Sequence, residues 1–335
     1  MSDFLDGLNP PQRQAVLHTE GPLMIIAGAG SGKTRVLTRR IAYLLAERNV
    51  SPYEVLAITF TNKAAGEMKE RVAELVGDRA KMMWVSTFHS ACVRILRREA
   101  SLLGYTNSFT IYDQSDSLRL ITLVMRDMNL DAKRYAPRAV ASLISQAKNE
   151  LMGPADYLNQ AKDQFQEIVA QVFAIYQKRL TGANSMDFDD LIAKTVEVLQ
   201  RQPEVKAKYR SRFKHILVDE YQDTNHAQYV LIKELVGSER EGMPVAELCV
   251  VGDADQSIYA FRGANIRNIL QFEADYPSAK TILLEQNYRS TQNILNAANA
   301  VISNNDGRKE KNLWSDAGAG SPLTGYVAES EHDEA

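Results

Sequence analysis

The chain of 335 residues is long enough for two domains, and its 45% hydrophobic and 24% charged residues are ordinary for a globular protein. A net charge of −3 excludes a basic field over the whole molecule, so any surface that binds nucleic acid must be local. Cys92 and Cys249 lie far apart and give no sign of a disulfide framework or a zinc site. The acidic N-terminus and the absence of a long apolar run argue against a signal peptide and a membrane span, so we expect a cytoplasmic protein.

A strand, a glycine-rich loop and the start of a helix follow one another near the N-terminus. The apolar run 23–26 leads into the sequence AGAGSGKT at residues 27–34. Small residues let backbone N–H groups turn toward phosphates, Lys33 can reach the β- and γ-phosphate oxygens, and the Thr34 hydroxyl can hold Mg²⁺. Ala27 stands where the strict pattern has glycine, which costs little at negative φ. This segment predicts a nucleoside triphosphate site.

Short apolar runs alternate with helical patterns on both sides of a helical middle part. The runs are residues 23–27, 55–60, 83–86, 215–219, 248–253 and 281–284. This alternation is typical of βαβ units and predicts an α/β fold, with a parallel sheet and helices on both faces. Strand signals vanish between about Thr106 and Ser185, which predicts an all-α insertion.

Three parts follow from this pattern. Residues 1–105 and 185–284 form the sheet-bearing domain, and residues 106–184 form the helical insertion. Residues 285–335 begin a further unit, with a helix near residues 292–304 and a strand near residues 323–327. The acidic residues at the C-terminus resemble the first turn of another helix, so we expect the chain to be a piece of a longer protein.

Two carboxylates, Asp219 and Glu220, end the apolar run 215–218. In an open parallel sheet, ligands bind beyond the carboxyl ends of the strands. Asp219 can hold Mg²⁺ through a water molecule, and Glu220 can orient and deprotonate the water that attacks the γ-phosphate. Gln256 and Arg289 each follow a later apolar run and are candidates for contact with the γ-phosphate and for stabilising transition-state charge. An isolated acidic pair or arginine is more often solvated, and the phosphate loop favours the catalytic interpretation.

Seven blocks, in order along the chain, resemble the motifs of superfamily 1 helicases of the UvrD/PcrA/Rep group, which are bacterial 3′-to-5′ DNA helicases. The blocks are residues 8–12, 27–34, 59–65, 86–90, 218–225, 251–259 and 287–290. The resemblance covers essentially the whole chain, and seven blocks in register are far more specific than one phosphate loop. It implies that the sheet-bearing part is a first RecA-like domain, that residues 106–184 are its accessory subdomain, and that residues 285–335 begin a second RecA-like domain.

The resemblance also implies ATP and Mg²⁺ as cofactors and assigns residues to them. Gln12 would read the adenine, and Tyr288 would stack on it with Arg35 nearby. The implied nucleotide and metal set is Gln12, Ala29, Gly30, Ser31, Gly32, Lys33, Thr34, Arg35, Asp219, Glu220, Gln256, Tyr288 and Arg289.

A single-stranded DNA track is implied as well. Its residues would be Phe60, Asn62, Thr87, His89, Tyr259, Phe261 and Arg262. Aromatic rings stack on bases of any identity at about 1–3 kcal/mol each, which suits movement over every sequence. Basic residues of the helical parts are further candidates for phosphate contact. They are Arg94, Arg97, Arg98, Lys133, Arg134, Arg138 and Lys148.

The predicted function is therefore an ATP-dependent 3′-to-5′ DNA helicase of repair or replication, with single-stranded DNA and single/double-strand junctions as partners and a place at the nucleoid. Repair or replication proteins are further possible partners. The family's motifs V and VI have no counterpart before Ala335, so we expect the chain alone to bind ATP weakly, to hydrolyse it slowly and not to unwind DNA. The alternatives are a helicase subunit of a RecB/AddA-type helicase-nuclease, a P-loop ATPase that acts on a small molecule, and a non-catalytic nucleotide-gated module.

Overall fold

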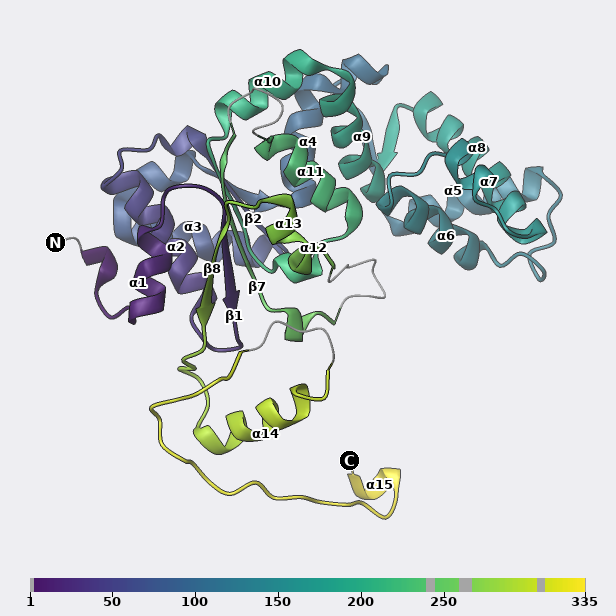
Figure 1. Ribbon diagram of the computed structural model, residues 1–335. Helices are drawn as coiled ribbons and strands as arrows, with labels where there is room; N and C mark the ends of the chain where they lie inside the picture. The colour runs from purple at the N-terminus through teal and green to yellow at the C-terminus, as the bar shows by residue number, and fades with distance from the viewer. Residues whose placement is uncertain (1–2, 239–244, 259–266, 306–310, 335) are drawn as a thin grey trace.

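A six-stranded sheet is the centre of the computed structural model, which describes residues 3–238, 245–258, 267–305 and 311–334 (Figure 1). Its strand order is β3-β2-β6-β7-β1-β8, and every neighbouring pair is parallel. The strands are β1 (Leu23–Ala27), β2 (Val55–Thr59), β3 (Trp84–Thr87), β6 (His215–Val218), β7 (Glu247–Gly252) and β8 (Lys280–Leu284). The predicted α/β fold with a parallel sheet is confirmed.

The sheet separates two hydrophobic cores, because side chains alternate between the faces of a strand. Leu23 and Ile25 of β1 pack with one set of helices, and Met24 and Ile26 pack with the other. The first set is α1 (Pro10–Leu17), α2 (Lys33–Ala46) and α3 (Asn62–Val76). The second set is α4 (Phe88–Glu99), α9 (Phe188–Arg201), α10 (Pro203–Arg212), α11 (His226–Val236), α12 (Arg267–Leu270) and α13 (Phe272–Asp275). With both faces covered, the strands read as continuous apolar runs.

Short 3₁₀ helices connect these elements. They are η1 (Asp3–Leu5), η2 (Pro52–Glu54), η3 (Gly77–Met82), η4 (Ala100–Leu103), η5 (Tyr221–Asp223) and η7 (Ala254–Gln256). Within the ranges given above, no helix is both long and apolar enough to cross a membrane.

The predicted helical insertion has its own hydrophobic core and extends away from the sheet (Figure 1). Its helices are α5 (Gln114–Asp127), α6 (Pro137–Asn149), α7 (Pro154–Asn159) and α8 (Gln164–Gly182). It is not purely helical, because β4 (Thr110–Tyr112) pairs in parallel with β5 (Ser185–Asp187) where the chain leaves and returns. Three-residue strands are too short to give a periodic signal in the sequence.

The C-terminal part contains α14 (Gln292–Ile302) and the short α15 (Glu331–Glu334). The helix expected near residues 292–304 is present, and the acidic end of the chain forms a helical turn as predicted. The strand expected near residues 323–327 is wrong, because this segment has no strand conformation. Val327 is 91% exposed, so the apolar pattern there has nothing to pack against within the described parts of the chain.

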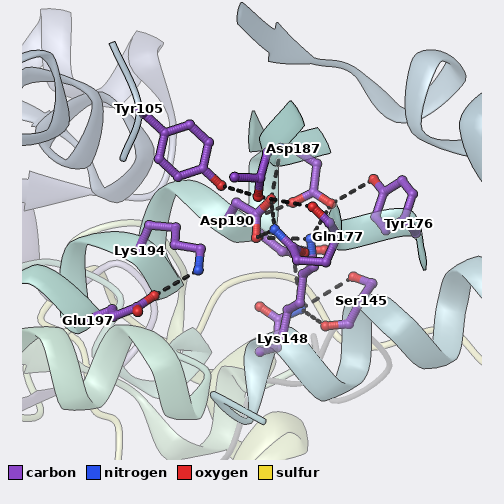
Figure 2. A network of polar contacts seen from close by, with 12 residues as sticks. Tyr105, Ser145, Lys148, Tyr176, Gln177, Asp187, Asp190, Lys194 and Glu197 are labelled. Atoms are coloured by element: carbon purple, nitrogen blue, oxygen red, sulfur yellow. Dashed lines mark hydrogen bonds and ion pairs between the residues drawn. The ribbon is translucent and has the colours of Figure 1, made fainter. Parts of the chain in front are cut away.

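A buried polar network fastens the insertion to the sheet-bearing domain (Figure 2). Lys148 of α6 contacts Asp187 at 2.6 Å and Asp190 at 2.9 Å, and the lysine side chain is 3% exposed. The hydroxyl of Tyr176 donates to Asp187 at 2.8 Å, and Gln177 donates to Asp190. Burial opposes the charge on Lys148, but the two carboxylates outweigh it and raise the pKa of Lys148. The prediction that Lys148 could contact DNA phosphates is therefore wrong, since its ammonium group is buried and paired with two carboxylates of the protein.

Replacing Lys148 by Met should lower the free energy of unfolding by about 3–5 kcal/mol, because two buried carboxylates lose their counter-charge. Denaturant titration followed by circular dichroism measures this. The matched control is Lys81→Met, since Lys81 is 68% exposed and pairs with Asp78 on the surface. A Lys148→Met protein as stable as the control variant would contradict the role given to the network.

Candidate functional site

The phosphate loop joins β1 to α2 and is closed by its own hydrogen bonds. The Ser31 hydroxyl donates to the Gly28 carbonyl at 2.7 Å, and the Ser31 N–H donates to the same oxygen at 3.2 Å. Gly30 and Gly32 have φ values of +68° and +85°, a region that other L residues adopt at a cost. Gly32 immediately precedes the first turn of α2, so the loop and the positive end of that helix face the same space.

Gln12 lies directly beneath this loop and is fully buried. Its side-chain amide donates to the Ser31 carbonyl at 2.8 Å, and its amide oxygen accepts from the Asn9 N–H at 3.1 Å. A Cβ atom at Gly32 would lie 2.9 Å from the Gln12 amide nitrogen. In the structure Gln12 supports the phosphate loop, while its contact with adenine stays a prediction.

The predicted catalytic side chains meet at one cavity of about 390 Å³. Lys33 contacts Glu220 at 3.1 Å, and its ammonium lies 3.5 Å from the side-chain oxygen of Gln256. Arg289 lines the same cavity. The full lining is Ala29, Gly30, Gly32, Lys33, Thr34, Arg35, Arg71, Glu220, Gln256 and Arg289. Residues from four separate segments are therefore brought together as the sequence predicted, and Arg71 adds a fifth.

Arg71 was not predicted. It lies in α3, where it also approaches Glu67 one helical turn away at 3.8 Å. A charged residue at i,i+4 spacing from an opposite charge is typical of a solvated helix face, so the sequence carried no signal for this position.

The acidic pair follows β6. Burial, and then the negative charge of Glu220, raise the pKa of Asp219 to about 6. Glu220 itself has φ = +48°, an uncommon conformation for a residue with a side chain. Strained backbone of this kind concentrates at functional sites, where surrounding contacts hold it in place.

Gln222 provides such contacts and was missed by the sequence analysis. Its amide donates to Glu220 Oε2 at 2.9 Å, and its oxygen accepts from the Asp253 N–H at 2.9 Å. A Cβ atom at Gly252 would lie 2.8 Å from that oxygen, so the glycine permits the close approach. Gln222 therefore links the loop after β6 to the loop after β7.

The segment after β8 completes the site. The Asn287 side chain donates to the Ala29 carbonyl at 2.6 Å, and the Tyr288 N–H donates to the Gly30 carbonyl at 2.9 Å. The Tyr288 ring is half exposed, and its hydroxyl accepts from the Asn9 side chain at 3.0 Å. Tyr288 therefore lies beside the segment that carries Gln12, as the predicted adenine site requires.

Arg35 contacts the N-terminal segment. Its guanidinium lies 3.5 Å from the Asp6 carbonyl. It also lines the cavity, one residue beyond Thr34, so its predicted place near the nucleotide is compatible with the structure.

Several predicted DNA residues gather beyond β2 and β3, at the sheet edge that carries the phosphate loop. Thr87 caps α4 by accepting from the Ser90 N–H, and the Ser90 hydroxyl lies 3.5 Å from the side-chain oxygen of Asn62. The half-buried His89 ring meets the Phe188 ring edge-on at 5.7 Å, and burial lowers the pKa of His89. Phe60, immediately after β2, is partly buried.

Phe188 is not among the predicted DNA residues, yet its ring is 49% exposed beside His89. An exposed phenylalanine at the first position of a helix is indistinguishable by sequence from one that packs. Three predicted DNA residues, Tyr259, Phe261 and Arg262, lie outside the described residues.

A phosphate loop joins β1 to α2, and an acidic pair follows β6 of the same parallel sheet. This combination defines a P-loop nucleoside triphosphatase. Residues 8–277 match the UvrD/REP helicase N-terminal domain, and residues 282–335 match the UvrD-like helicase C-terminal domain. The chain belongs to the UvrD/REP helicase family.

Curated relatives agree with this assignment. The chain is 64% identical over 337 residues to the ATP-dependent DNA helicase UvrD1 of Mycobacterium tuberculosis, and 61% identical over 341 residues to UvrD1 of Mycobacterium leprae. It is 55% identical over 335 residues to the ATP-dependent DNA helicase PcrA of Staphylococcus aureus. These alignments cover 99–100% of this chain and 44–45% of the relatives, so the chain spans less than half their length.

Replacing Gly30 by Ala should destabilise the protein by about 1–3 kcal/mol, because the new side chain requires an unfavourable φ. The added Cβ would also lie 2.7 Å from the Asn287 amide and 2.8 Å from Arg289 Cβ. Gly66→Ala is the matched control, since Gly66 lies within α3 with open space around it. That change should stabilise the protein by about 0.5–1 kcal/mol. Thermal unfolding of both variants measures the difference, and a Gly30→Ala protein that melts at or above the wild-type temperature would contradict this geometry.

Proposed function

We propose that the protein containing this chain is an ATP-dependent DNA helicase that moves 3′ to 5′ along single-stranded DNA, and that this chain supplies its first ATP-binding domain. The observation that carries the proposal is the convergence of Lys33, Glu220, Gln256 and Arg289 on one cavity, at the sheet edge that also carries Asn62, Thr87 and His89. A nucleotide site and a candidate DNA surface at one edge allow ATP turnover to move DNA-contacting loops.

The cavity residues suit the phosphates of ATP. Loop N–H groups and Lys33 would bind the β- and γ-phosphate oxygens, and Arg289 would neutralise charge that develops on the γ-phosphoryl group. Glu220 would orient a water molecule and accept its proton as the water oxygen bonds to the γ-phosphorus and the bond to the β-phosphate oxygen breaks. Lys33 lies near enough to Glu220 to fix the position of that carboxylate.

The donors also suit Mg²⁺, a hard cation that prefers oxygen ligands. The Thr34 hydroxyl and the Asp219 carboxylate are the candidates for holding it, the latter through a water molecule. Because the pKa of Asp219 is about 6, the carboxylate is mostly ionised at pH 7, as cation binding requires. When bound, the ion would neutralise phosphate charge.

The partners we propose are single-stranded DNA and single/double-strand junctions, reached in the cytoplasm at the nucleoid. The exposed Phe188 ring beside His89 offers a stacking surface for bases. The relatives compared above are named as helicases, which does not favour the alternatives of a helicase-nuclease subunit or a small-molecule ATPase.

The test is steady-state ATP hydrolysis by the full-length protein, with and without single-stranded DNA. We expect strong stimulation by DNA and loss of turnover in a Lys33→Ala blank. Turnover that is indifferent to DNA would overturn the proposal in favour of an ATPase that acts on a small molecule.

Glu220→Gln should lower kcat for ATP by roughly 10²–10⁴, because the amide cannot accept the proton of the attacking water. Nucleotide binding should persist, since the phosphate loop is unchanged. Single-turnover hydrolysis and equilibrium binding of a fluorescent ATP analogue separate the two effects. Glu47→Gln, at an exposed position beyond the C-terminal end of α2, is the control. Wild-type turnover by Glu220→Gln would exclude this residue as the base.

Phe188→Ala should weaken binding of single-stranded DNA by about 1–3 kcal/mol, the value of one stacked base. The matched control is Tyr53→Ala, because Tyr53 is 53% exposed but precedes β2, at the opposite end of the strand from Asn62. Fluorescence anisotropy with labelled oligonucleotides at fixed salt measures both. Equal affinities of the two variants would remove Phe188 from the DNA surface.

A further inference from the structure

Lys311 is a buried lysine outside the predicted motifs. Its ammonium contacts the carboxylates of Asp253 and Asp255, and its side chain is 3% exposed. The two aspartates lie 58 and 56 residues away in sequence, in the loop that follows β7. Lysine is buried this deeply only when its charge is compensated, so the burial of Lys311 depends on these two carboxylates.

Asp253 controls the position of Gln256. Its carbonyl accepts from the Gln256 N–H at 2.9 Å, and its carboxylate accepts from the Gln256 side-chain amide. The same carboxylate accepts from the Asp255 N–H at 3.0 Å and so caps η7, the helical turn that carries Gln256. A shift of the Asp253 carboxylate therefore changes both the backbone and the side chain of Gln256.

The network continues from Asp253 to the acidic pair. The Asp253 N–H donates to Gln222, whose amide donates in turn to Glu220. Lys311 is thus connected through Asp253 to two groups of the ATP cavity. From Asp253, one further hydrogen bond reaches Gln256 and two reach Glu220. Charge-assisted hydrogen bonds such as those of Lys311 are the strong members of such a chain.

The residues that follow Lys311 bind the segment after β8 and the phosphate loop. The Asn312 N–H donates to the Glu285 carboxylate at 2.8 Å, and the Trp314 carbonyl accepts from the Asn287 N–H at 2.7 Å. The Leu313 side chain lies so close to the phosphate loop that a Cβ at Gly28 would be 2.2 Å from it. Residues 311–314 therefore touch the loop after β7, the segment after β8 and the phosphate loop at once.

We propose that Lys311 is a positioning residue for ATP hydrolysis, which sets Gln256 and Glu220 in place through Asp253. This inference rests on the proposed ATPase function. Lys311 lies in the segment that matches the helicase C-terminal domain, whereas Asp253 and Gln256 lie in the segment that matches the N-terminal domain. The contact thereby makes the geometry of the hydrolytic groups depend on where the C-terminal segment sits.

The test compares Lys311→Met and Lys311→Arg with wild type in the full-length protein, using ATP hydrolysis at saturating single-stranded DNA. Lys311→Met should lower kcat roughly ten- to hundredfold, since small displacements of catalytic groups cost this much. KM for ATP should change less than about threefold, because the groups that bind the phosphates remain. Lys311→Arg keeps the charge and should recover most of the lost kcat.

Controls separate this role from a structural one. Lys81→Met removes a lysine from a surface ion pair and should leave kcat unchanged. Circular dichroism and thermal melting establish that each variant is folded. If Lys311→Met does not fold, Asp255→Asn decides the matter, because it removes only the more exposed of the two partners and leaves Asp253 paired. It should lower kcat in the same direction by a smaller factor.

A folded Lys311→Met protein with kcat within about twofold of wild type would overturn the inference, as would wild-type kcat in Asp255→Asn where the Met variant is unfolded. An arginine variant as inactive as the methionine variant would also count against it. These outcomes leave the proposed function intact. Failure of the proposed function looks different, since wild type itself would then show no DNA-stimulated turnover that Lys33→Ala removes.

Discussion

Parallel pairing is the constraint on which the site depends. When β1 lies between β7 and β8, and β6 lies beside β7, the carboxyl ends of all these strands fall on one edge of the sheet. The loops that leave this edge carry the phosphate loop, Glu220, Gln256 and Arg289. A one-residue slip of β1 would exchange its two buried faces, so packing in the two cores fixes the register of the strand. That register in turn fixes the position of the phosphate loop relative to the neighbouring loops.

Polar networks then fix what the sheet brings close. The hydrophobic cores place the loops within a few ångströms, but they do not orient a carboxylate or an amide. Gln222 does so by donating to Glu220 within its own loop and accepting from the Asp253 N–H of the next, and Asn287 does so by donating to the phosphate loop. Buried groups of this kind are costly when left unpaired, so each bond restricts the positions of the groups that it joins.

The fold and most residues of the cavity could be predicted from the sequence, because both depend on patterns within short contiguous segments. A strand, its loop and the next helix are local, so Lys33 or Asp219 can be identified without knowing what lies opposite. Three site residues were not predicted, because the contacts that matter are with residues far away in the chain. They are Arg71, Gln222 and Phe188. The strand expected near residues 323–327 was wrong for a related reason: an apolar pattern forms a strand only where a partner strand receives it.

Two buried lysines illustrate how little a charged residue reveals by itself. Lys148 and Lys311 each have a side chain only 3% exposed and each contacts two carboxylates. The partners decide the consequence. Asp187 and Asp190 lie where the insertion returns to the sheet-bearing domain, so Lys148 joins these two parts of the chain. Asp253 holds a cavity side chain, so the contact of Lys311 reaches the groups that would meet the γ-phosphate. The same chemistry therefore joins two parts of the fold in one place and contacts the partner of a cavity side chain in the other, and only the topology distinguishes them.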